Sequence, residues 1–289
     1  MLGVADTAFS LPTKDPLALI FGNRLVKTGL KKAYRDFESD KVIMRSFLKT
    51  EIAKIKEGRG KKEGRQTPLT IVEAIIDESE KEKDGAYHSE KMVDEIVTFI
   101  FAGSDTTSNF ITMMLLEVYK RPAMLERLRE EIREHIGEGE ITAEGLKELK
   151  YLECIQYETN RMFGPVEAVF ARMPTQEIVV GDIPIQNNTV LTMSMKPTFF
   201  NPKYFPDPHS FRPERWEGDN TTEMLNLIGY AFSGGPRTCI GKHIALLESK
   251  IAMVKFIRRY SAIKELHERV IALGITSTLV QPEVRLTKF

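Results

Sequence analysis

Cys239 is the residue whose surroundings point most clearly to chemistry. It lies in the stretch FSGGPRTCIGKH, close to Gly234, Gly235 and Gly241. Glycines adopt backbone conformations that other residues avoid, so they can turn amide N–H groups toward the sulfur and let the backbone pass close to a bulky ligand. A helix is expected directly after Gly241, and the positive end of its dipole favours a thiolate. The stretch therefore predicts a cysteine thiolate that faces a ligand.

Two other interpretations of Cys239 stay open on spacing alone. One is a small buried cysteine beside a C-terminal helix, with no chemistry of its own. The other is a zinc site formed with His243, which lies four residues further along the same helical face. It is the weaker of the two, because no further Cys or His follows at ligand spacing to complete a tetrahedron.

A second stretch, FIFAGSDTTSNF, places polar residues in the middle of a long apolar window. Gly103 costs a helix about 1 kcal/mol relative to alanine, and Asp105, Thr106 and Thr107 are poor residues for a helix interior. Such a violation of local propensity is expected at a functional site, because a hydroxyl there can replace a bond within the helix and open a groove for a small ligand. A kink with satisfied polar side chains is the alternative.

Glu158 and Arg161, in the stretch ECIQYETNRMF, are an acidic and a basic residue three positions apart. On a helix the two side chains share one face and can form an ion pair, which contributes only a few tenths of a kcal/mol when it is exposed. The pair taken alone therefore assigns no function.

Helices must position most of these residues, as the hydrophobic periodicity indicates. The expected helices cover residues 23–57, 68–80, 89–119, the stretch LERLREEIREHI after Pro122, 149–162 and 241–260. Two charged segments, EGRGKKEGRQTP and EKEKDGAYH, separate the first three helices and are expected to be solvated linkers. The helix at 89–119 is long and apolar, so we expect it to cross the middle of its domain.

The last helix and the strands complete the expected elements. Apolar residues fall at steps of four and three along the last helix, which predicts one buried stripe made of Ile240, Ile244, Leu247, Ile251 and Val254. Alternating residues between Ile178 and Met195, and the closing stretch GITSTLVQPEVRLTKF, predict short strands. The fold class is therefore mainly α with a small β part.

Composition and charge limit the classes of function. The chain has 289 residues, 42% of them hydrophobic, which describes a soluble globular protein with material for one large core or two modest ones. Its 41 basic and 41 acidic residues balance, so it lacks the basic excess typical of nucleic-acid binding. Cys154 and Cys239 are too few for a secreted disulfide framework and fit an intracellular location. The most apolar window, 96–118, contains Asp105 and Glu117, so we interpret it as a buried helix rather than a membrane span.

Together, these stretches resemble those of the cytochrome P-450 haem-thiolate monooxygenases. AGSDTT on a long helix is followed by ETNR on a later helix, then by FRPERW, and then by FSGGPRTCIG before the last helix, and their order and approximate spacing are similar to the family's. The resemblance covers residues 89–289, which it identifies as the haem-binding part. Residues 1–88 resemble the helical middle region of the family fold, with charged linkers. The resemblance thus implies the C-terminal half to two-thirds of that fold.

The resemblance implies haem b (iron protoporphyrin IX) as the cofactor. Cys239 matches the axial ligand, whose thiolate donates electron density to iron and favours cleavage of dioxygen. Phe232 matches the apolar shield of the sulfur, and Arg237 and Arg172 match positions that pair with the haem propionates. The implied cofactor-binding set is Arg172, Phe232, Gly235, Arg237, Cys239 and Gly241.

Two further groups of residues match family positions away from the cysteine. Asp105 and Thr106 match the acid and alcohol pair on the oxygen side, where the hydroxyl stabilises oxygen during its activation and the carboxylate helps to relay protons. Glu158, Arg161 and Arg215 match a buried triad whose role is structural. Removing one partner of such a triad would leave an unpaired buried charge.

The matching pocket positions are mostly apolar, which implies a hydrophobic small-molecule substrate. They are Phe101, Ala102, Val166, Ala168, Val169, Ser277, Thr278 and Leu279. The implied reaction inserts one oxygen atom from O2 into this substrate, with electrons from a reductase. Basic residues of the last helix could meet an acidic electron-transfer partner or form an ordinary solvated face; they are Lys242, Lys250, Lys255, Arg258 and Arg259.

The chain also departs from the family pattern. Family members carry a large N-terminal portion with the main sheet and a Trp-x-x-x-Arg haem contact, whereas the one tryptophan here, Trp216, belongs to FRPERW. We therefore expect an N-terminally truncated chain, in which any membrane tether would lie in the missing segment. A second hypothesis follows, a non-catalytic fragment that binds haem weakly or not at all.

Overall fold

The computed structural model describes residues 32–59, 70–81, 89–218, 221–267, 269–273, 276–279 and 283–289. The chain divides into two compact units, Met1–Ser104 and Asp105–Phe289, and the boundary falls within the long helix α6 (Ser89–Tyr119). The predicted bounds of α6 are confirmed. Among the described residues, no helix is long and apolar enough to cross a membrane. The functional division predicted at residues 88 and 89 stays a prediction.

The first unit contains α4 (Lys32–Arg59), α5 (Ile71–Lys81) and the beginning of α6. Helix α5 begins with a capping box, because the hydroxyl of Thr70 accepts from the amide of Glu73 at 3.1 Å and the Glu73 carboxylate accepts from the amide of Thr70 at 3.1 Å. The three helices share a small core made of Leu48, Ile52, Ile76, Met92, Val93 and Ile96. Both helices predicted before α6 are confirmed, except that residues 23–31 and 68–69 lie outside the described residues.

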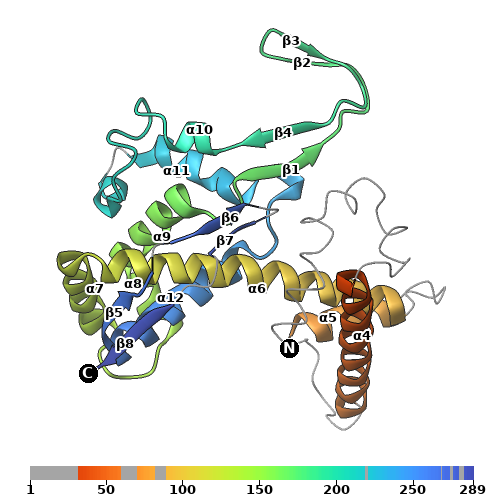
Figure 1. Cartoon of the computed structure of the whole chain (residues 1–289), viewed down its shortest axis with the longest axis horizontal. Helices are drawn as coiled ribbons and strands as arrows, with labels where there is room; N and C mark the ends of the chain where they lie inside the picture. The colour runs from red at the N-terminus through yellow and green to blue at the C-terminus, as the bar shows by residue number, and fades with distance from the viewer. Residues whose placement is uncertain are drawn as a thin grey trace. The chain divides into compact units, whose positions relative to one another are not determined.

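The second unit packs the remainder of α6 with α7 (Pro122–His135), α8 (Ala143–Glu148), α9 (Lys150–Phe163) and α12 (Lys242–Arg259) (Figure 1). Fully buried side chains from four of these helices meet in its core, among them Met114, Leu128, Leu152, Ile155 and Met253. Between α9 and α12 lie α10 (Lys196–Phe199) and α11 (Thr222–Gly229), and three single turns at Pro213–Trp216, Tyr230–Phe232 and Gly235–Arg237. Helices dominate, as the sequence predicts.

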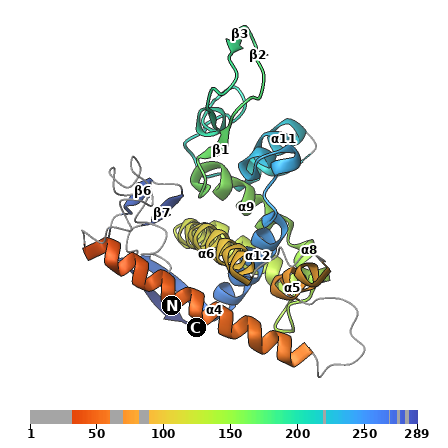
Figure 2. The same ribbon diagram turned by 90° about the vertical axis from the view of Figure 1, so that its right-hand side faces the viewer.

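Four antiparallel strand pairs make up the described β part. They are β1 (Ala168–Arg172) with β4 (Leu191–Ser194), β2 (Ile178–Val180) with β3 (Ile183–Ile185), β5 (Tyr260–Glu265) with β8 (Val284–Lys288), and β6 (Ile271–Leu273) with β7 (Ser277–Leu279). The β2–β3 hairpin projects from the second unit (Figures 1 and 2). Its two-residue turn begins at Gly181, whose φ of 60° is a conformation that glycine adopts at little cost.

The single buried stripe predicted along α12 is wrong for its first half. Val254 is fully buried, but Ile240, Ile244 and Leu247 are 80%, 53% and 48% exposed. The buried face of α12 is instead made of Ser249, Met253, Val254 and Ile257, and all of these except Ser249 lie in its second half. There the helix packs against α7, α8 and α9. The first half therefore carries apolar side chains that are about half exposed.

Candidate functional site

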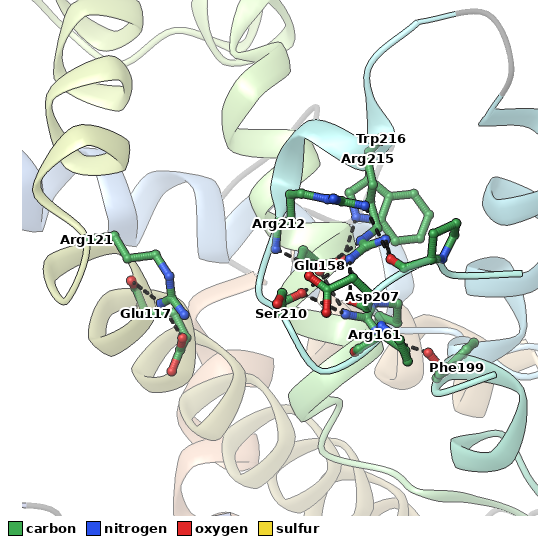
Figure 3. Close-up of polar contacts among 12 residues, drawn as sticks. Glu117, Arg121, Glu158, Arg161, Phe199, Asp207, Ser210, Arg212, Arg215 and Trp216 are labelled. Atoms are coloured by element: carbon green, nitrogen blue, oxygen red, sulfur yellow. Dashed lines mark hydrogen bonds and ion pairs between the residues drawn. The ribbon is translucent and has the colours of Figure 1, made fainter. Parts of the chain in front are cut away.

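Glu158 is the centre of a buried polar cluster (Figure 3). Its oxygens accept hydrogen bonds from Arg161 Nε at 2.9 Å and Nη2 at 2.8 Å, and from Arg215 Nε at 3.0 Å. The indole of Trp216 and the backbone amide of Arg212 each add a bond of 2.9 Å. Glu158 and Arg161 are almost completely buried. The structure thus brings together the three residues of the predicted triad, and it adds Trp216, which sequence reasoning left out although it stands in the same FRPERW stretch.

Two guanidinium groups share this one carboxylate, and backbone carbonyl groups bind their other N–H groups. Arg161 Nη1 donates to the carbonyls of Phe199 and Pro208, both at 2.8 Å. Arg215 donates to the carbonyls of Pro206, Asp207 and Ser210. Burial lowers the pKa of Arg215, and the charge of Glu158 opposes this shift. The cluster therefore fixes the path of residues 199–216 against α9.

Aromatic packing extends this fixed segment toward the cysteine loop. The ring of Trp216 lies 5.8 Å from that of Phe205 and 5.5 Å from that of Tyr157, measured between ring centroids. Ile228 of α11 belongs to the same buried cluster as Trp216. Helix α11 leads directly into the turn at Tyr230–Phe232, and the cysteine loop follows. The position of Cys239 is thus set from α9, through the triad and α11.

The cysteine loop is held by its own backbone. The amide of Cys239 donates to the carbonyl of Phe232 at 2.8 Å, and the amide of Thr238 donates to the carbonyl of Gly235 at 3.0 Å. Gly235 has a φ of 67°, which explains the predicted need for glycine there. A Cβ at Gly234 would lie 3.0 Å from the ring of the exposed Tyr230, so a larger residue there would force this ring to shift by a few tenths of an ångström.

The two cysteines differ in their surroundings. Cys239 is exposed, so the interpretation as a small buried cysteine is wrong. Cys154 is the buried one, and burial, followed by the charge of Glu217, raises the pKa of its thiol to about 12. Among the residues that the structure describes, no cluster of three or more Cys, His, Asp or Glu side chains could hold a metal ion, so no further ligand joins Cys239 and His243 in a zinc site.

Helix α6 runs without a break through the AGSDTT stretch. The carboxylate of Asp105 accepts a hydrogen bond from the hydroxyl of Thr276, and the backbone carbonyl of Asp105 accepts one from the side-chain amide of Asn109 at 2.7 Å. Asn109 in turn accepts from the amide of Leu279 at 3.0 Å. Thr106 is half-buried. Sequence reasoning missed Thr276 and Asn109, because no local pattern links residues so far apart in the chain.

A cavity of about 250 Å³ lies beside these residues in the second unit. Its lining is Asn109, Met113, Met162, Phe163, Gly164, Glu167, Lys196, Ile271, Ser277 and Leu279. Of the predicted pocket residues, Ser277 and Leu279 line it. Val166 and Ala168 flank Glu167 and are half-buried.

The remaining predicted pocket residues do not line this cavity. Phe101 and Ala102 belong to the first unit, and the side chains of Val169 and Thr278 lie outside the described part of the structure. Glu167 and Lys196 were not predicted, and they make the lining more polar than expected.

Comparison with known proteins identifies the family to which the chain belongs. The family model described as "Cytochrome P450" matches residues 7–285. The chain belongs to the cytochrome P450 family. The family predicted from the four sequence motifs is thereby confirmed.

Individual P450 relatives agree with this assignment. Probable cytochrome P450 4d20 of Drosophila melanogaster is 31% identical over 243 residues, which make up 78% of this chain and 48% of the relative. Cytochrome P450 4V2 of Mus musculus is 31% identical over 228 residues, 77% of this chain and 42% of the relative. Cytochrome P450 3A13 of Mus musculus is 30% identical over 246 residues, 82% of this chain and 48% of the relative. The chain spans about half the length of these curated P450s.

Membership of the P450 family implies haem as the cofactor, and the residues of the cysteine loop fit such a group. Cys239 is exposed, and it lies two residues before Gly241, the N-cap of α12. Ile240 and Ile244 give the same region an exposed apolar surface, which a large apolar ring system would cover. Arg237 and Arg172 are both exposed, and a guanidinium group can bind carboxylates such as the haem propionates.

The basic residues of α12 are less free than the sequence suggested. Lys250 Nζ donates to the carbonyl of Leu146 at 3.2 Å and lies 3.4 Å from the carboxylate of Glu153. Arg258 donates to the carbonyl of Gly139 at 3.0 Å. These two side chains brace α12 against α8, α9 and the α7–α8 loop, so they contribute little to an external docking face.

Proposed function

We propose that the chain is the haem-binding part of a P450 monooxygenase. In this proposal it inserts one oxygen atom from O2 into a hydrophobic small molecule, with electrons from a reductase. The observation that carries the proposal is the exposed thiol of Cys239, in a glycine-bearing loop at the start of α12 and beside an exposed apolar face, in a member of this family. Haem, in the b form, would supply the oxygen activation and electron-transfer chemistry.

The protein's own residues take the following roles in this proposal. Cys239 would hold the iron through its thiolate, and Phe232 would limit access of water to the sulfur. Arg237 and Arg172 would orient the cofactor by pairing with its carboxylates. Asp105 and the neighbouring Thr106 would relay protons to the site of oxygen activation. The hydroxyl of Thr276 fixes the carboxylate of Asp105 for this role.

The proposed electron donor would dock on the side of α12. Since Lys250 and Arg258 are engaged within the protein, the cationic residues left for this face are Lys242, Lys255 and Arg259. Exposed charges of this kind mainly raise the rate of association and make it depend on salt. An intracellular location, suggested by the small number of cysteines, also stays a prediction.

The carbon monoxide spectrum of the reduced, haem-loaded chain tests the ligand assignment. A thiolate ligand shifts the Soret band strongly to the red, so we expect the parent to show this band and Cys239→Ala to lose it entirely. Cys154→Ala is the matched control, because it removes the buried thiol and leaves the exposed one. A red-shifted band that survives in Cys239→Ala would show that another group binds the iron.

A further inference from the structure

Glu167 lines the cavity, and its two carboxylate oxygens differ in their hydrogen bonds. Oε1 lies 2.6 Å from Lys196 Nζ and accepts a hydrogen bond from the Ser277 hydroxyl at 2.7 Å. Oε2 receives no hydrogen bond from any residue that the structure describes. Because an ionised carboxylate can only accept, Oε2 is available to accept a hydrogen bond from a ligand in the cavity that Glu167 helps to line.

The backbone around Glu167 is held in place independently of its side chain. The carbonyl of Glu167 accepts from the amide of Met195 and from the hydroxyl of Ser194, both at 3.3 Å. The amide of Ser277 donates to the carbonyl of Pro165 at 2.7 Å, so β7 is fixed beside the same segment. An acceptor that is positioned before the ligand arrives loses less freedom on binding.

The rest of the lining is mostly apolar or already engaged. Apolar side chains come from Met113, Met162, Phe163, Ile271 and Leu279. The side-chain amide of Asn109 donates to Asp105 and accepts from Leu279. Burial would raise the pKa of Glu167, but hydrogen bonds from Lys196 and Ser277 outweigh burial and lower it, so the carboxylate is ionised at neutral pH.

We propose that this cavity takes compact apolar molecules that carry one hydrogen-bond donor, a hydroxyl or an N–H group, which binds Glu167 Oε2. The inference rests on the proposed function, because it names the class of substrate that the monooxygenase would accept. A molecule without a donor would strip water from a carboxylate oxygen and return no bond. Donor-bearing molecules are therefore selected over their isosteres.

Three probes of one shape test the inference by isothermal titration calorimetry on the full chain. 1-Adamantanol carries the donor, 1-methyladamantane replaces the hydroxyl by a methyl group, and 1-methoxyadamantane keeps the oxygen without its hydrogen. We expect the alcohol to bind about tenfold more tightly than either of the other two, the usual effect of one hydrogen bond to a charged group. Equal affinities, or no measurable binding of the alcohol, would overturn the proposal without recourse to any variant.

Two variants locate the selectivity. Glu167→Leu removes the acceptor, so the preference for the alcohol should vanish, whereas Glu177→Leu makes the same change at an exposed position outside the lining and should preserve it. A preference that persists in Glu167→Leu contradicts the proposal.

The carbon monoxide spectrum separates this inference from the proposed function. A thiolate spectrum without selectivity for the alcohol rejects the donor-binding site alone. Selectivity for the alcohol in a chain that gives no thiolate spectrum rejects the haem assignment and leaves the donor-binding site standing.

Discussion

Glu158 supplies the one carboxylate of a cluster that contains two buried guanidinium groups. If leucine replaces it, Arg161 and Arg215 keep their positive charges in a buried site that no longer holds a negative one. We expect Glu158→Leu to lower the free energy of unfolding by about 3–5 kcal/mol, measured by urea titration.

A surface ion pair of the same unit provides the control for this variant. Arg133 and Glu126 lie 3.6 Å apart on α7, and both side chains are exposed. Arg133→Ala should lower the free energy of unfolding by no more than about 0.5 kcal/mol. Similar losses in the two variants would show that the Glu158 cluster does not hold the second unit together.

A substitution at Thr106 can test the proposed proton delivery without an expected effect on folding. Thr106→Ala removes one hydroxyl next to Asp105 and adds a favourable helix residue. In a haem-loaded, reductase-coupled assay, we expect haem content to be unchanged and the share of electrons recovered as hydrogen peroxide to rise severalfold. Thr112→Ala is the control on the same helix, because among the described residues the Thr112 hydroxyl bonds only the carbonyl of Ser108, at 2.7 Å. An equal rise in both variants contradicts the role given to Thr106.

At the scale of elements, Arg269 joins the end of α6 to β5. It donates to Glu265 of β5, with Nε at 2.6 Å, and to the buried carboxylate of Glu117 on α6. Glu117 is also bonded by Arg121, as Figure 3 shows. Arg269→Met keeps the length of the side chain and removes these bonds, so we expect a loss of about 1–3 kcal/mol in the free energy of unfolding at pH 7.

The same contact predicts a dependence on pH. The hydrogen bond from Arg269 lowers the pKa of Glu265, and burial only partly opposes it. A folded-state pKa below the unfolded value stabilises the protein at neutral pH, and this stabilisation is lost as the pH falls through the folded value. Between pH 7 and pH 4, the parent should therefore lose more stability than Arg269→Met. A gap between the two proteins that is constant over this range would argue against the assignment.

The sequence predicted elements well where one signal dominates. The bounds of α6 follow from a long apolar run, and the β2–β3 hairpin follows from alternation around Gly-Asp. The buried stripe predicted along α12 is wrong for its first half, because periodicity shows which residues share a face and not whether protein covers it. Glu167 was missed for a related reason. Its neighbours are apolar, and its role depends on Lys196 and Ser277, which the fold brings from distant parts of the chain.

At the scale of the whole molecule, we expect haem to cover the exposed apolar side chains at the start of α12. Ile240, Ile244 and Leu247 together offer a dye such as anilinonaphthalene sulfonate an apolar surface. If haem covers this surface, its addition should lower the dye fluorescence of the parent by about half or more, and Cys239→Ala should respond much less. Unchanged fluorescence in the parent would favour the hypothesis of a non-catalytic fragment that binds haem weakly or not at all.

The bonds of Arg161 and Arg215 to carbonyl groups affect which substitutions the loop between them can accept during evolution. The two arginines hold residues 199–210 by hydrogen bonds to backbone carbonyl oxygens, which every amino acid carries. Side chains along that course, such as the exposed Ser210 and His209, can therefore drift among orthologues while the loop keeps its shape. The triad thus holds the shape of this loop, and the exposed positions along it are left open to mutation, whereas the buried Phe205 is not.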